Sequence, residues 1–332
     1  MTEKMLPQQS DIWWKKILSV PGWLQFVILV GFIAILPPLI GNYWTHVLSY
    51  VGIYIMLGIG LNVVVGFAGL LDLGYVAFYA IGAYSYALLA SPKYGVHIPF
   101  WVMVPPCAAL AALGGALLGI PVLRMRGEYL AIVTLGFGEI IRILINNLDI
   151  LTNGPKGVLR IDPPTIGSFT FATPTHFYYL ILAGCLLSVF IVTRLNHSRI
   201  GRAWVAMRED QDAAALMGID LLKYKLMAFA IGASFAGVGG INFSARMGSI
   251  FPDDFSVMVS VNVVCLIIIG GIGSIPGVIL GAIVLIGIPE VLRAVAIYRM
   301  LAFGLLLVIM MIFRPMGFIP SARTKLELKK EN

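Results

Sequence analysis

One apolar stretch of the chain carries polar groups that could bind a small solute. Asn62 stands at its start, Asp72 lies near its end, and Gly66, Gly69 and Gly74 interrupt it. Glycines allow a helix to unwind, and irregular backbone inside a membrane occurs only beside protein or a water-filled cavity. Free carbonyls can bind an ammonium group, and a helix N-terminus attracts a carboxylate. The stretch is therefore a candidate wall of a translocation pathway for a small zwitterion.

A structural interpretation of the same residues stays open. Glycines also permit close crossing of membrane helices, and Asp72 could cap a helix at the membrane interface. A carboxylate at the bilayer centre costs about 3 kcal/mol, which a position near the membrane face would lower.

Glu139 and Arg142 form a second candidate site. Their i, i+3 spacing places them on one face of a helix, where a buried ion pair is cheaper than a single charge. The pair could clamp two helices, contact a partner subunit or meet an amino-acid head group.

Motifs for catalysis, metal binding and ATP hydrolysis are absent from the sequence. The 4 histidines are scattered, the 3 cysteines lie in separate apolar runs, and no Ser-His-Asp grouping occurs. There is no G-x4-G-K-[ST] phosphate loop. We therefore expect no catalytic residue, no metal ligand and no cofactor in this chain.

Composition assigns the chain to the membrane. It is 59% hydrophobic and 12% charged, with a mean hydropathy of +0.94, whereas soluble domains are about 25% charged. The net charge of +7 comes from basic residues in short breaks between apolar runs. That placement is typical of cytoplasmic membrane loops and does not indicate a nucleic-acid partner.

The predicted fold is an all-α polytopic membrane protein with about ten transmembrane helices, because apolar runs of about 20 residues cross the hydrocarbon. The runs are 23–40, 43–65, 69–90, 100–121, 128–146, 176–194, 226–246, 257–272, 275–292 and 298–313. Within 257–292, the glycine-rich segment 270–277 could be a tight turn or a re-entrant break.

Lys and Arg predict the orientation. With ten spans both termini share one side, which holds sixteen basic residues against six on the other, so this side should be cytoplasmic. We expect a cytoplasmic or interfacial segment at 1–22, a transmembrane domain at 23–313 and a cytoplasmic tail at 314–332.

The loop at 195–225, on the same side, has helical content. Its candidate residues are charged or small: Arg202, Arg208, Glu209, Asp210, Asp212, Ala213, Ala214 and Gly218, the last as a helix C-cap. Small residues allow close approach to a partner, and the charges would orient it. The alternative is a helix that only lies along the membrane surface.

The segment DAAALMG at 212–218 is similar to the EAA-x3-G signature of permease subunits in bacterial ATP-binding-cassette importers, with Asp for Glu. Segments 60–84, 121–147, 200–219 and 298–320 resemble, in order, the LivM-type permease subunits of branched-chain amino acid importers. The chain departs from the family's usual REDEIAA at Gln211 and Asp212.

This resemblance implies a permease subunit in the inner membrane, whose 195–225 loop forms the coupling helix that docks on an ATPase. It implies a second homologous permease subunit of the LivH type, two cytoplasmic ATPases that bind ATP and Mg²⁺, and an extracytoplasmic amino-acid-binding protein. The expected substrates are Leu, Ile and Val; urea, short amides and other amino acids remain alternatives. An ion-driven secondary transporter is a rival from another class, but the sequence shows no convincing internal repeat and few central ionisable groups.

Overall fold

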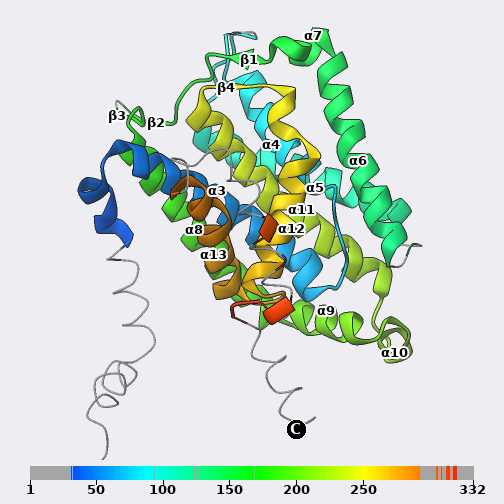
Figure 1. Ribbon diagram of the computed structural model, residues 1–332. Coiled ribbons are helices and arrows are strands. Elements are labelled where there is room, and N and C mark those ends of the chain that lie inside the picture. The colour runs from blue at the N-terminus through cyan, green and yellow to red at the C-terminus, as the bar shows by residue number, and fades with distance from the viewer. Residues whose placement is uncertain are drawn as a thin grey trace, which may run out of the picture.

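The computed structural model describes residues 31, 33–92, 94–122, 125, 127–167 and 169–291, with short stretches at 304–305, 308, 312–314 and 317–319. This part of the chain is a bundle of helices with four very short strands (Figure 1). The prediction of an all-α polytopic membrane protein is confirmed.

The long helices of the bundle are α3 (Asn42–Leu61), α4 (Val76–Leu89), α5 (Phe100–Val122), α6 (Glu128–Asn147), α8 (Pro174–Asn196), α11 (Leu221–Met247) and α12 (Val257–Gly270). Three short elements continue one another after α12: α13 (Ile275–Ala282), the π-helix η4 (Ile283–Gly287) and α14 (Ile288–Val291). Residues 33–40 are also helical.

Among the described residues, 6 helices are long and apolar enough to cross a membrane. Val76–Leu89 and Ile275–Val291 are shorter apolar helices. The predicted spans between residues 43 and 292 thus all have helical counterparts. Most of the predicted spans 23–40 and 298–313, the segment 1–22 and almost all of the tail 314–332 lie outside the described residues.

Helix α11 runs through the centre of the bundle, where it packs against α3, α4 and α5. Small residues make this possible: an added Cβ on Gly115 of α5 would come within 2.7 Å of the Ala233 Cβ on α11. Helix α4 is buried over most of its length. Its apolar residues therefore show no preferred face, as expected for a helix surrounded by others.

Helices α5, α6 and α8 present large apolar side chains outward. Leu113, Leu117, Ile132, Ile140 and Phe190 are each at least 59% exposed. In water this surface would be an aggregation hazard. On a chain of this composition it is the surface that contacts hydrocarbon.

The two ends of the bundle differ, and we name them by their contents (Figure 1). The strand end holds α7 (Asp149–Thr152), the 3-10 helices η2 (Gly154–Lys156) and η3 (Pro252–Phe255), and two antiparallel strand pairs. Strand β1 (Val158–Leu159) pairs with β4 (Ser249–Ile250), and β2 (Thr165–Ile166) pairs with β3 (Phe169–Thr170). The α10 end holds α9 (Arg199–Glu209) and α10 (Gln211–Leu216).

The glycine-rich segment between α12 and α13 is a tight turn. Residues 271–274 reverse the chain, and Gly281 of α13 approaches the backbone of Leu266 in α12. The two helices that flank it therefore form an antiparallel hairpin, in agreement with the tight-turn interpretation.

The predicted span 69–90 begins later than expected. The helix starts at Val76, and residues 68–75 have no regular structure. Two glycines explain this: Gly69 has a φ of +69°, and Gly74 packs against the Thr134 backbone with no room for a Cβ.

Candidate functional site

The break between the second and third predicted spans begins with a π-helix, η1 (Asn62–Phe67), that continues α3. The Asn62 side chain is completely buried, and its Oδ1 accepts a hydrogen bond from the Gly273 amide at 2.9 Å. The same oxygen fills the space where a side chain at Gly66 would stand. Asn62 therefore ties the end of α3 to the α12–α13 turn. A π-helical turn often marks a functional site.

Asp72 holds the second part of the break in shape. Its Oδ1 accepts a hydrogen bond from the Gly74 amide at 2.9 Å, and the Leu73 amide donates to Thr134 Oγ1 of α6 at 3.0 Å. The Asp72 side chain is 0% exposed. These contacts are those of a turn, so this conformation favours the structural interpretation of Asp72 over direct contact with a solute.

The predicted pathway residues are therefore brought together, but mostly inside the protein. Asn62, Gly66, Asp72 and Gly74 are all buried. Gly69 is exposed and borders a hollow of about 230 Å³ that Gln211 of α10 also lines. The break thus faces α10 and not the middle of the bundle.

Helix α9 is docked on the bundle by one face. Ser198 Oγ caps it by accepting from the Gly201 amide at 3.3 Å. Trp204 and Met207 are completely buried, and Trp204 Nε1 donates to the Tyr224 carbonyl at 2.8 Å. Arg202, on the opposite face, is exposed and reaches the carbonyl of His197.

Helix α10 is short and sharply bounded. Asp210 Oδ1 caps it by accepting from the amides of Asp212 at 2.8 Å and Ala213 at 3.0 Å. Gly218, with a φ of +82°, follows its end as the predicted C-terminal stop. The acidic residues Glu209 and Asp212 are both exposed.

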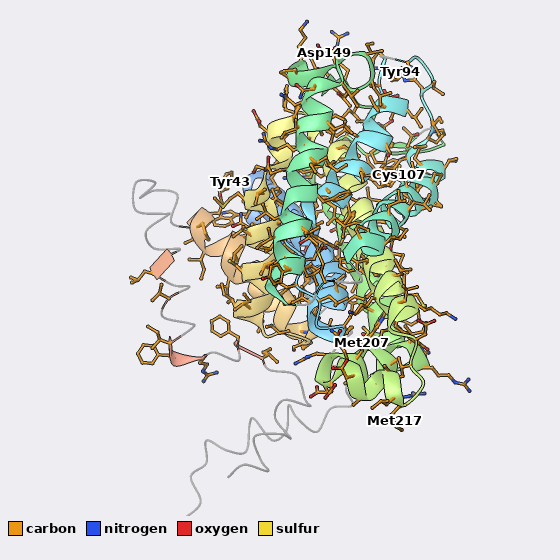
Figure 2. The ribbon with its side chains drawn as sticks, turned by 90° about the vertical axis from the view of Figure 1, so that its right-hand side faces the viewer. Tyr43, Tyr94, Cys107, Asp149, Met207 and Met217 are labelled. Atoms are coloured by element: carbon orange, nitrogen blue, oxygen red, sulfur yellow. The ribbon has the colours of Figure 1, made fainter. Side chains whose placement is uncertain are left out.

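The exposed face of α10 is apolar at its end. Leu216 is 89% and Met217 83% exposed, whereas Ala214 is only 4% exposed. Figure 2 shows Met217 at the extremity of the α10 end and Met207 closer to the bundle. Of the predicted coupling residues, Ala213 faces outward and Ala214 packs inward.

Two residues that sequence reasoning missed fix α10 to α11. Lys225 is 4% exposed, and its Nζ donates to Gln211 Oε1 at 3.0 Å. From the sequence, Lys225 reads as one more charge of the loop, and only the fold reveals its burial and its partner.

Arg208 joins the two candidate sites. From the last turn of α9, its Nη1 donates to the Gly66 carbonyl of η1 at 2.7 Å. Its aliphatic stem lies against Gly69, where an added Cβ would come within 2.9 Å of the Arg208 Cγ. The loop and the helix break are therefore one connected assembly.

The predicted ion pair forms, but it is not buried in this chain. Glu139 Oε2 lies 2.9 Å from Arg142 Nη2, with the two side chains 32% and 31% exposed. Arg142 Nη1 also lies 3.6 Å from Asp253 Oδ1. Because Asp253 belongs to η3, the contacts link α6 to the segment before α12.

Within the described ranges, no group of three or more His, Cys, Asp or Glu side chains could hold a metal ion. The placement of ATP and Mg²⁺ on other subunits stays a prediction.

Comparison with known proteins places the chain in a family. Residues 43–314 match the family described as "Branched-chain amino acid transport system / permease component". The chain is 45% identical to the high-affinity branched-chain amino acid transport system permease protein LivM of Escherichia coli, over 83% of this chain and 70% of that protein. LivM of Salmonella typhimurium gives the same identity and the same coverage.

Similarity extends to a second type of permease. LivH of Escherichia coli is 27% identical over 80% of this chain and 91% of its own length. No solved structure matches the chain. On the family match and the identity with LivM, this chain belongs to the family of permease components of branched-chain amino acid transport systems.

Proposed function

We propose that the chain is one permease subunit of an ATP-driven importer that carries leucine, isoleucine and valine into the cytoplasm across the inner membrane. Its partners would be a homologous LivH-type permease, two cytoplasmic ATPases with their ATP and Mg²⁺, and an extracytoplasmic amino-acid-binding protein. The names of the LivM and LivH relatives support the substrate class and the second permease.

The observation that carries the proposal is the connection from α10 to the helix break. Leu216 and Met217 offer an apolar surface at the α10 end, as a docking site for another subunit would. A partner that moves α10 also moves α9, and Arg208 passes that displacement to Gly66. ATP binding and hydrolysis on the docked ATPases would thereby change the shape of η1 and the access of the pathway.

The α10 end would face the cytoplasm, together with both termini. Basic residues around α9 and α10 support this orientation under the positive-inside rule: Arg194, Arg199, Arg202, Arg208, Lys223 and Lys225. The strand end would then meet the binding protein.

Uptake of radiolabelled leucine tests the function. Cells that lack the gene should lose leucine uptake, and the restored gene should return it, with competition by unlabelled isoleucine and valine. If cells that lack the gene take up leucine at an unchanged rate, under conditions in which the whole operon is expressed, the substrate is instead urea, an amide or another amino acid. If uptake persists without ATP but stops when ion gradients are dissipated, the protein is a secondary transporter and not part of an ATP-driven importer.

Leu216→Glu tests docking of an ATPase on α10. The side chain is 89% exposed, so a charge there alters the surface without disturbing the packing. Ala214 is unsuitable for this test because it is buried. We expect Leu216→Glu to lose both the co-purifying ATPase and leucine uptake. Leu222→Glu, at a 56% exposed position of α11 outside α10, is the matched control. Normal co-purification of the ATPase with Leu216→Glu would refute the docking site.

A further inference from the structure

A cavity of about 650 Å³ opens at the strand end, between α3, α11, α12 and the η4–α14 segment. Its volume lies within the range of pockets that bind small molecules. None of the predicted pathway residues lines it. Tyr43, labelled in Figure 2, marks its position on the side of the bundle.

The cavity contains a cation with unused hydrogen-bond donors. Arg246 stands in the last turn of α11, and its Nη2 donates to the His46 carbonyl at 2.8 Å. Its Nε and Nη1 are buried and have no hydrogen-bond partner among the described residues. Buried guanidinium nitrogens with unsatisfied donors are unfavourable unless an acceptor completes them. A carboxylate is the acceptor that guanidinium binds best.

Other lining groups fit the remainder of an amino acid. Glu290 brings a carboxylate to the cavity and accepts a hydrogen bond from the Tyr43 hydroxyl. A carboxylate has several acceptor positions, so it can also receive an ammonium group. The lining also includes the aliphatic side chains of Val47, Leu285 and Ile286, beside Tyr50, Tyr54 and Asn262.

The cavity extends along α3 into the bundle. Tyr54 lies 12 residues into α3, about 18 Å from the helix start at 1.5 Å per residue. Ionisable side chains at such depth face protein or water and not hydrocarbon. Its ionisable lining therefore favours water or protein over hydrocarbon at the opening.

We infer that this cavity is an outer substrate subsite, in which Arg246 binds the carboxylate of an α-amino acid with an aliphatic side chain. The inference rests on the proposed function and assigns it a site at the strand end. The subsite would receive the amino acid before the break near Gly66 changes the access of the pathway.

The first test measures leucine uptake by the complete importer with Arg246→Gln. We expect uptake about tenfold lower, because the variant loses a charge-assisted bond to the carboxylate. The matched control is Arg160→Gln, which removes an exposed cation at the strand end outside the cavity. If the unsubstituted importer does not take up leucine, the proposed function is overturned. If the unsubstituted importer takes up leucine and the Arg246→Gln and Arg160→Gln variants do so at equal rates, this inference alone is overturned.

A second measurement does not depend on the folding of the Arg246 variant. Met258 lines the cavity and is 59% exposed, so Met258→Cys in the assembled complex should react with a maleimide. Excess leucine should slow that reaction, whereas leucinol, which lacks the carboxylate, should not. Leu159→Cys, at a 54% exposed position outside the cavity, should react equally with and without leucine. If leucine leaves labelling at Met258→Cys unchanged, Arg246 is not a substrate site.

Discussion

The Nη1 of Arg208 donates to the carbonyl of Gly66 at 2.7 Å, although 142 residues separate the two in sequence. A carbonyl in a π-helix is available to a donor from another helix because the irregular turn leaves backbone groups outside the regular α-helical hydrogen-bond pattern. The bond connects the helix that precedes α10 to the end of α3. It is a direct physical link between the α9–α10 segment and the break.

Arg208→Ala should uncouple the importer. The exposed face of α10 is unchanged, so we expect the ATPase to co-purify and to hydrolyse ATP, while leucine uptake falls roughly tenfold. Reconstituted complex in liposomes gives both rates from one preparation. Arg199→Ala is the matched control, since it removes an exposed arginine of the same helix that is not among the predicted coupling residues. Uptake that falls equally in both variants would contradict a specific role for the Gly66 contact.

Asp210→Ala should weaken α10. The substitution removes the cap that holds the amides of Asp212 and Ala213, a loss of about 0.5–2 kcal/mol for an N-cap. We expect faster proteolytic cleavage between 210 and 220 and less co-purified ATPase. Asp210→Asn keeps an acceptor oxygen and should behave like the unsubstituted chain. If both variants are cleaved at the original rate, the cap does not determine the order of α10.

Local signals in the sequence predicted much of the fold. Apolar runs located the described spans, and Gly218 predicted the end of α10 because a C-cap acts through the backbone of its immediate neighbours. The glycines around Gly69 similarly marked the break. A six-residue helix has too few positions to choose a buried face, which is why Ala214 could not be recognised as packed.

Contacts between distant segments were not predictable. Arg208 and Lys225 read as solvated charges of a loop, yet one reaches η1 and the other is buried against Gln211. Arg246 read only as a charge that ends a span. Its position in a cavity depends on α3, α12 and α14 packing around it, and no local sequence pattern predicts that packing.

Gly74→Ala should destabilise the protein strongly. A methyl group at this position would collide with the Thr134 carbonyl of α6, which is backbone and cannot swing away. We expect a lower melting temperature in detergent and reduced insertion into the membrane. Gly136→Ala is the matched control on α6, where an added Cβ meets nothing within 4 Å. It should be neutral or stabilising by about 0.5–1 kcal/mol, because alanine favours the helix. Equal melting temperatures for the two variants would contradict the close approach.

Substitutions of Glu139 and Arg142 distinguish a structural clamp from a substrate contact. Both side chains are about one-third exposed, so each of Glu139→Gln and Arg142→Gln should cost no more than about 1 kcal/mol of stability. As a clamp between α6 and η3, the pair is not required for transport, and uptake should stay within about twofold of the original rate. The charge-swapped chain with Glu139→Arg and Arg142→Glu should recover part of the lost stability, because the i, i+3 spacing still pairs the charges. If either single substitution abolishes leucine uptake while the complex remains assembled and thermally stable, the pair belongs to the translocation pathway and the clamp is the wrong interpretation.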